Sequence, residues 1–233
     1  MKLAIISDIH GNLEGLMKAL SIIDERRVDE IVCLGDVVGY GANPNECLDL
    51  VRKRCSVVIK GNHDEAALDP QGPHDFNPIA QRAIDWTGRT LSAANKVYLG
   101  ERPMVWRSEG ILFVHASPRM PELWNYIVST DDALDALRAF EERICFIGHT
   151  HLPGIFSLAG RSRSVAKEER FLVNVGSVGQ PRDGNPMLAF GIFDSDAWSY
   201  ELVRSEYDIH KATEKIIAAG LPEELGYRLM YGM

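Results

Sequence analysis

Residues 1–10 read MKLAIISDIH, and this stretch sets the pattern of the first part of the chain. Leu3–Ile6 is a short apolar run of the kind that forms a buried strand, and Asp8 and His10 follow it directly. An apolar run that ends in polar residues then recurs twice, at residues 31–36 (IVCLGD) and at residues 57–64 (VVIKGNHD).

The segments between these three runs have the spacing of helices. Asn12 can cap a helix whose apolar side carries Leu13, Leu16 and Leu20. Pro44 suits the first turn of a second helix that runs to about residue 54. The order strand, helix, strand, helix, strand predicts βαβ units and a parallel sheet.

The rest of the chain alternates in a different way. Further strands are expected at Met104–Arg107, Ile111–Val114, Ile144–Ile147, Gly154–Leu158, Phe171–Val175, Leu188–Phe193 and Trp198–Val203. Helices are expected over residues 79–101, after a cap at Thr130, and over residues 207–230 with a break at Gly220-Leu221-Pro222. The polar stretch Gly160–Arg170 is interpreted as a solvated hairpin loop. We therefore predict one α/β domain over residues 1–233, a four-layer α/β/β/α sandwich of two mixed sheets flanked by helices.

Composition narrows the class of protein. The chain has 233 residues, 45% of them hydrophobic, and a formal charge of −8, which argues against a nucleic-acid binder with a basic face. The first apolar run is shorter than the roughly 7–15 residues of a signal-peptide core, and no segment approaches the roughly 18 apolar residues of a membrane span. Four cysteines without a C-x-x-C pair predict reduced, mostly buried thiols. We expect a cytoplasmic protein with no membrane partner.

Five of the seven histidines fall in short polar clusters that follow apolar runs. The clusters are Asp8-Ile9-His10, Gly35-Asp36, Gly61-Asn62-His63-Asp64, His115 and Gly148-His149-Thr150-His151. In an open α/β sheet, ligands bind beyond the carboxyl ends of the strands. Imidazoles and carboxylates bind Zn²⁺, Mn²⁺ and Fe, and two neighbouring ions can clamp a phosphate. The clusters predict such a site, whereas His74 and His210 are interpreted as surface residues.

Taken in order, the clusters resemble the pattern D-x-H, G-D, G-N-H-[DE], H, G-H-x-H of the calcineurin-like metallophosphoesterase superfamily. The resemblance covers roughly residues 3–203. The phrases GDVVGYG (35–41), HASPR (115–119) and GSVGQPR (176–182) look like the small prokaryotic branch that includes YfcE-type phosphodiesterases and symmetrical dinucleoside-tetraphosphate hydrolases.

The resemblance implies a metal-dependent phosphoric ester hydrolase with two divalent ions, Mn²⁺ first and Fe or Zn²⁺ as alternatives. It assigns Asp8, His10 and His151 to the first ion, Asn62, His115 and His149 to the second, and Asp36 to both. It also implies that a hydroxide between the ions attacks phosphorus in line.

The resemblance further implies that His63 and Asp64 are catalytic. His63 would protonate the leaving oxygen or stabilise its charge, and Asp64 would orient His63 or a ligand. An equal alternative for Asp64 is a carboxylate at a helix N-terminus. Protein serine/threonine phosphatases carry G-D-x-x-D-R-G, where this chain has Gly39 and Tyr40 in place of the second Asp and the Arg. This departure counts against a phosphoprotein phosphatase and leaves the partner of His63 open.

The candidate substrate-binding residues are Asn62, Tyr40, Arg119 and Arg182. A guanidinium matches phosphate bidentately, and both arginines follow predicted strands. The alternatives are surface arginines and a packed loop tyrosine.

Three functions remain in view. The preferred one is hydrolysis of a small phosphoester or phosphoanhydride, specifically diadenosine tetraphosphate. The alternative within this class is a phosphodiesterase acting on cyclic or simple diesters. A different class is a non-catalytic scaffold on the same fold. The expected partner is a small phosphorylated substrate, a nucleotide, and the absence of a heptad seam leaves the oligomeric state open.

Overall fold

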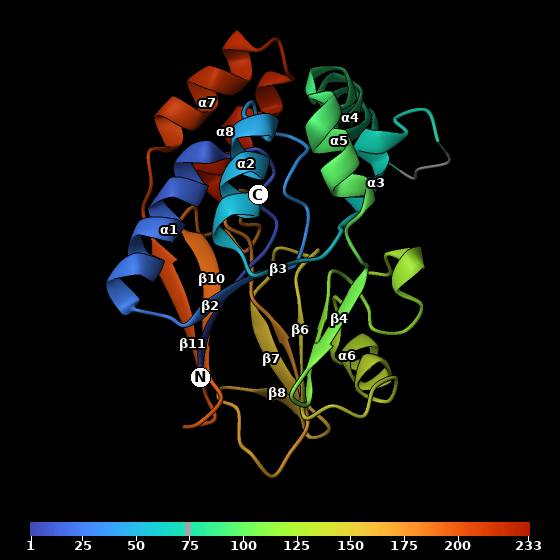
Figure 1. The fold of residues 1–233 in the computed structure, drawn as a ribbon, viewed down its shortest axis with the longest axis vertical. Helices are drawn as coiled ribbons and strands as arrows, with labels where there is room; N and C mark the ends of the chain where they lie inside the picture. Colours follow the sequence, from blue (N-terminus) through green and yellow to red (C-terminus); the bar gives the residue numbers. More distant parts are fainter. Residues whose placement is uncertain (73–75) are drawn as a thin grey trace.

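The computed structural model describes residues 1–72 and 76–233, which form two mixed sheets packed between helices (Figure 1). The predicted α/β/β/α arrangement is confirmed. The first sheet has the strand order β11-β10-β1-β2-β3. Its strands are β1 (Lys2–Ile6), β2 (Glu30–Cys33), β3 (Val57–Val58), β10 (Leu188–Asp194) and β11 (Ser199–Ser205).

The N-terminal part of this sheet follows the predicted βαβ order. Helices α1 (Leu13–Arg26) and α2 (Pro44–Arg54) connect β1, β2 and β3, which run parallel. Asn12 caps α1, because its side-chain oxygen accepts a hydrogen bond from the Gly15 N–H at 3.0 Å. Strand β10 pairs antiparallel with β1, so the sheet is mixed.

The second sheet has the order β4-β5-β6-β9-β7-β8. Its strands are β4 (Val105–Ser108), β5 (Ile111–Val114), β6 (Ile144–Ile147), β7 (Gly154–Ser157), β8 (Gly160–Ser162) and β9 (Phe171–Asn174). Strands β5, β6 and β9 run parallel. Helix α6 (Thr130–Leu137) covers the outer face of this sheet.

Two local predictions need correction. The stretch Gly160–Arg170, predicted as a hairpin loop, begins with a strand, β8, which pairs with β7 through a tight turn, and only the residues after Ser162 form a loop. This strand lies at the sheet edge, where polar side chains face solvent, so it has no apolar signature. Helix α6 is capped by Ser129, whose hydroxyl accepts from the Asp132 N–H at 3.1 Å, and Thr130 is the first helical residue.

Alternation along β1 explains the layers. Leu3 and Ile5 point into the core between the two sheets, whereas Ala4 and Ile6 point into a core beneath α1 and α2. A third core lies between the second sheet and α6. Each face of each sheet is therefore covered by another layer, as the period of two in a buried strand requires.

Five more helices gather in the upper half of Figure 1, beyond the first sheet. They are α3 (Asn62–Leu68), α4 (Pro78–Thr90), α5 (Ala93–Gly100), α7 (Ile209–Ala218) and α8 (Glu223–Tyr231). The predicted break between the last two is confirmed. Within the described residues, no helix is both long and apolar enough to cross a membrane. All four cysteines are free, and three of them are buried.

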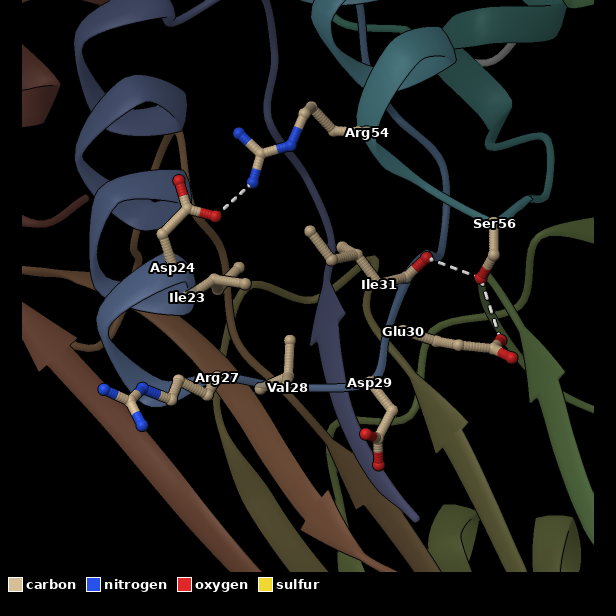
Figure 2. Close-up of a pocket in the computed structure, with 9 residues that line it drawn as sticks. All are labelled: Ile23, Asp24, Arg27, Val28, Asp29, Glu30, Ile31, Arg54 and Ser56. Carbon is tan, nitrogen blue, oxygen red and sulfur yellow. Dashed lines mark hydrogen bonds and ion pairs between the residues drawn. The ribbon is translucent and has the colours of Figure 1, made fainter.

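A pocket of about 250 Å³ lies between the C-terminal end of α1 and the C-terminal end of α2 (Figure 2). Several of its polar side chains pair with one another. Arg54 pairs with Asp24 at 2.5 Å, and the Ser56 hydroxyl donates to Glu30 at 2.9 Å. The pocket contains none of the predicted site residues.

Phe146 on β6 gives a test of the core between the sheets. Its ring packs against Phe113 of its own sheet (5.7 Å between centroids) and against Phe193 of the opposite sheet (5.4 Å). We expect Phe146→Ala to lower the free energy of unfolding by about 3–5 kcal/mol, because it leaves a cavity. Leu202→Ala, at a 38% exposed position, should cost under about 1 kcal/mol. Urea unfolding followed by circular dichroism measures both, and equal losses would contradict the assignment of this core.

Candidate metal centre

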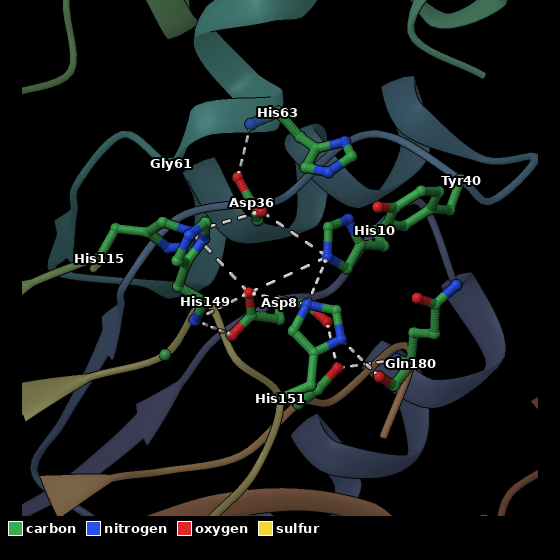
Figure 3. A network of polar contacts seen from close by, with 12 residues as sticks. Asp8, His10, Asp36, Tyr40, Gly61, His63, His115, His149, His151 and Gln180 are labelled. Carbon is green, nitrogen blue, oxygen red and sulfur yellow. Dashed lines mark hydrogen bonds and ion pairs between the residues drawn. The ribbon is translucent and has the colours of Figure 1, made fainter. Parts of the chain in front are cut away.

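The predicted ligands meet at the ends of strands from both sheets, as Figure 3 shows. Asp8 and His10 follow β1, and Asp36 follows β2. His115 follows β5, and the pair His149 and His151 follows β6; Asn62 begins α3. All of these side chains except that of the partly exposed Asn62 are buried.

The backbone at these positions is strained. Asp8, His10, Asp36, His149 and His151 all have positive φ angles, between 51° and 67°. Such left-handed conformations cost of order 1–3 kcal/mol each in residues with a side chain, and they persist only where the surroundings hold them. Their concentration at the predicted ligand positions indicates that the fold is built to aim these side chains inward.

Three histidines are oriented by buried backbone carbonyls. Their Nδ1 atoms lie within hydrogen-bond distance of a carbonyl oxygen: His10 of Val38 (3.1 Å), His115 of Leu34 (2.8 Å) and His151 of Gln180 (2.6 Å). A carbonyl only accepts, so in each case Nδ1 carries the proton. In the neutral ring, Nε2 then presents a lone pair to the centre, which is the arrangement of metal-binding histidines.

The lone pairs need a cation. His10 Nε2 lies 3.1 Å from His151 Nε2, and two unprotonated nitrogens at that distance repel each other. Within the described residues, His115 Nε2, His149 Nε2 and Asn62 Oδ1 are buried without a hydrogen-bond partner. Buried polar atoms are normally satisfied, so this set of nitrogen and oxygen donors fits divalent metal ions.

The donors fall into groups. The ligand atoms of Asp8, His10 and His151 lie within 4.8 Å of one another, and so do those of Asp36, His115 and His149. Asp36 Oδ2 is 3.7 Å from His10 Nε2 and 3.3 Å from His115 Nε2, so this carboxylate stands between the two groups. A third grouping joins His10 and Asp36 to His63.

The electrostatics favour positive charge beside Asp36. Burial alone would raise the pKa of Asp36, but His115 and His63 hold that pKa well below its usual range. Burial would lower the pKa of His115, yet Asp36 and Asp8 raise it to about 9. Burial lowers the pKa of His149 to about 3 and that of His63 to about 4. The centre thus combines ionised carboxylates with mostly neutral imidazoles.

His63 is confined by aromatic rings. Its centroid lies 4.4 Å from that of Tyr40, 4.7 Å from Phe76 and 4.8 Å from His10, and its Nδ1 has no hydrogen-bond partner among the described residues. A Cβ on Gly39 would lie 2.5 Å from this Nδ1. The place of the phosphatase aspartate is therefore filled by the His63 ring itself.

Asp64 braces two loops. Its carboxylate accepts from the N–H groups of Val37 (2.9 Å), Val38 (3.1 Å) and Gly61 (3.1 Å). It is the third residue of α3, and its bond from the Gly61 N–H ties the helix start to the residue before it. Burial and the charge of Asp36 raise its pKa to about 7. These contacts match the helix-start alternative and fix the loop that carries Asp36, whereas none of them is to the His63 side chain.

A cavity of about 820 Å³ opens beside the centre. Of the predicted substrate-binding residues, Asn62, Tyr40 and Arg182 line it, whereas Arg119 is exposed and lies outside its described lining. Among the lining residues that were not predicted, two carry groups suited to binding a substrate. The Tyr126 ring stacks on His149 at 4.0 Å, and Arg228 reaches in from α8. Neither follows an apolar run or a motif, so no local signal marked them. His210 is exposed on α7, and His74 lies outside the described residues.

Comparison with known proteins places this geometry in a family. The model of the calcineurin-like phosphoesterase superfamily domain matches residues 1–197. An uncharacterized protein of Methanocaldococcus jannaschii is 40% identical over 240 residues, 99% of this chain and 98% of that protein. A metallophosphoesterase crystal structure from Sphaerobacter thermophilus is 38% identical, with a TM-score of 0.91 and coverage of 100% and 99%. Phosphodiesterase YfcE of Escherichia coli is 26% identical over 85% of this chain and 90% of its own.

Metal binding should stabilise the fold, because a cation relieves the repulsion between His10 and His151. At Mn²⁺ concentrations about a hundredfold above Kd, we expect the melting temperature to rise by about 5–10 °C over a chelated sample. His151→Ala should lose at least half of this rise, whereas His210→Ala, at an exposed position, should keep it. Differential scanning calorimetry measures the shift. An unchanged rise in His151→Ala would show that this side chain is not a ligand.

Proposed function

We propose that this chain, which belongs to the calcineurin-like phosphoesterase superfamily, hydrolyses a small phosphoester or phosphoanhydride with two divalent metal ions. The observation that carries the proposal is the position of Asp36. Its carboxylate stands between two groups of buried donors, and each group contains two histidines. In the group of His10 and His151, the two Nε2 lone pairs face each other. One shared carboxylate between two donor groups is what a pair of neighbouring ions requires.

The residues divide between the two ions as follows. Asp8, His10 and His151 would hold the first, Asn62, His115 and His149 the second, and Asp36 both. When bound, such ions activate water as a nucleophile and neutralise the non-bridging oxygens of a phosphate. The mixed nitrogen and oxygen donors suit Mn²⁺ first, with Fe and Zn²⁺ as alternatives.

His63 would serve the leaving group. A neutral imidazole has one N–H, and the buried His63 ring packs against Tyr40 and Phe76, both of which line the cavity. From there it can donate a proton or a hydrogen bond to the leaving oxygen. Its own backbone N–H donates to Asp36 Oδ1 at 2.8 Å, which ties the acid to the shared ligand. Asp64 would act indirectly, because it fixes the loop that carries Asp36 and the residue that precedes Asn62 and His63.

Two substrate classes follow from the cavity and the relatives. A phosphodiester is favoured because YfcE, a relative over 85% of the chain, is a phosphodiesterase. Diadenosine tetraphosphate is favoured by the cavity of about 820 Å³, which offers Trp124 and Tyr126 as stacking surfaces and Arg182 as a phosphate partner. A non-catalytic scaffold would have no use for this cavity beside the donors.

The proposal is tested by phosphate-ester turnover with Mn²⁺. The panel is p-nitrophenyl phosphate, bis-p-nitrophenyl phosphate, a cyclic nucleotide and diadenosine tetraphosphate. We expect Asp36→Ala to lower kcat/KM by at least about 10³-fold, because both donor groups lose their shared ligand. Asp135→Ala, an exposed carboxylate on α6, should change it less than twofold.

Each outcome of the panel is informative. Turnover of the diesters alone assigns a phosphodiesterase, and conversion of the tetraphosphate to two diphosphates assigns the phosphoanhydride class. A metal-loaded protein that is inert toward the whole panel would overturn the proposal and favour the scaffold.

The role of His63 is tested by varying the leaving group. With methyl aryl phosphate diesters, His63→Ala should slow release of phenol, whose pKa is about 10, by about 10²–10⁴-fold. Release of p-nitrophenol, whose pKa is about 7, needs little protonation and should slow less than about tenfold. His210→Ala is the control for both esters. Equal slowing of the two esters by His63→Ala would exclude proton donation to the leaving oxygen.

A further inference from the structure

The last two helices contribute to the site although the family model ends at residue 197. Leu225 and Leu229 of α8 and Ile216 of α7 share a buried cluster with Tyr40, the residue that contacts His10 and His63. The C-terminal helix pair therefore forms part of the wall beside the metal centre.

Arg228 of α8 lines the same cavity as Arg182. The end of α8 is docked on the loop that carries Arg182. The Gly184 N–H donates to the carbonyl of Gly232 at 3.0 Å, and a Cβ on Gly232 would lie 2.6 Å from the backbone of Asn185. The Nε of Arg228 donates to the Met233 carbonyl at 3.0 Å, which orients its guanidinium. These backbone contacts fix the end of α8 against the loop that carries Arg182, and both arginines line the same cavity.

Arg182 is positioned by neutral groups. Its Nη2 donates to Gln180 Oε1 at 2.8 Å and to the Tyr40 hydroxyl at 3.4 Å, and its guanidinium lies 5.7 Å from the Tyr40 ring centroid. The loop is anchored further along by Arg204, which donates to the Met187 carbonyl at 3.0 Å and pairs with Asp183.

Two partly buried cations therefore face one cavity. Among the described residues, no Asp or Glu side chain forms an ion pair with Arg182 or Arg228. Burial and the charge of Arg182 lower the pKa of Arg228, so the pair repels. The acidic residues of the cavity, Glu65, Asp69 and Glu122, come from α3, the loop after it and the turn at Pro121–Leu123. A repelling pair of guanidiniums is stabilised by an anion placed between them.

We infer that Arg182 and Arg228 form a second anion subsite, which selects substrates carrying a further phosphate group beyond the one that is hydrolysed. The inference rests on the proposed function and deepens it, since the Tyr40 ring lies beside the donors His10 and His63 and also beside the guanidinium of Arg182. The scissile phosphate lies at the metal centre, and the second phosphate lies on the guanidiniums.

Binding tests the subsite without turnover. The probes are thymidine 5′-phosphate and thymidine 3′,5′-bisphosphate, which differ by one phosphate, titrated calorimetrically into the Mn²⁺-loaded protein. We expect the wild type to bind the bisphosphate about tenfold more tightly, the effect of a charge-assisted hydrogen bond. Arg228→Gln, which keeps the side-chain length, should reduce the preference to about twofold or less, and Arg228→Lys should restore part of it. Arg138→Ala, an exposed arginine after α6, should keep the full preference.

Turnover separates this inference from the proposed function. The substrates are the p-nitrophenyl esters of the same two nucleotides at the 5′-phosphate. Arg228→Gln should lose the preference in kcat/KM for the 3′-phosphorylated ester while leaving the other ester within about twofold of wild type. Preferential binding without any turnover would overturn the proposed function and leave the subsite standing. Equal affinity of the wild type for both probes, or an undiminished preference in Arg228→Gln, would overturn the subsite.

Discussion

Backbone hydrogen bonds between the loops after β1 and β2 are the constraint on which the centre depends. The N–H groups of Asp8, His10 and Gly11 donate to the carbonyls of Gly35 (3.1 Å), Asp36 (2.9 Å) and Val37 (2.9 Å). These bonds hold residues with left-handed backbone in place, and the carboxylate of Asp64 braces the second loop from behind. The two loops therefore act as one rigid unit, and each donor group takes at least one carboxylate from it.

Rigidity of this kind has an electrostatic cost. His10, His115 and His151 cannot turn away from the centre, because each is held through Nδ1 by a buried carbonyl. The centre therefore holds repelling lone pairs and ionised carboxylates close together, and the surrounding cores supply the stability that this arrangement costs. The same preorganisation means that ligands need not move to bind an ion, which favours tight binding with little loss of conformational entropy.

The sequence predicted the part of the site that follows from sheet geometry. Parallel strands bring their carboxyl ends to one edge, so residues just after apolar runs, such as Asp8, Asp36 and His115, could be placed together without coordinates. Arg228 could not, because its position depends on the packing of α8 against Tyr40 and on the contact between Gly232 and Asn185. Strand β8 could not be predicted for a related reason, because an edge strand needs only one hydrogen-bonded neighbour and no apolar side chains. Long-range packing, not local pattern, decides such features.

The close contact between Gly39 and His63 limits how this protein can change. An aspartate at position 39, the residue that protein serine/threonine phosphatases have there, would need both a different backbone, since Gly39 has a φ of +92°, and a displaced His63 ring. Neither change is useful alone. An aspartate at position 39 clashes with the present His63 ring, and a displaced His63 ring without that aspartate no longer lies where it can serve the leaving group. A single substitution therefore cannot lead from this chain to the phosphatase dyad. An intermediate sequence with only one of the two changes is therefore sterically disfavoured. Proteins that have either arrangement are expected to retain it during evolution.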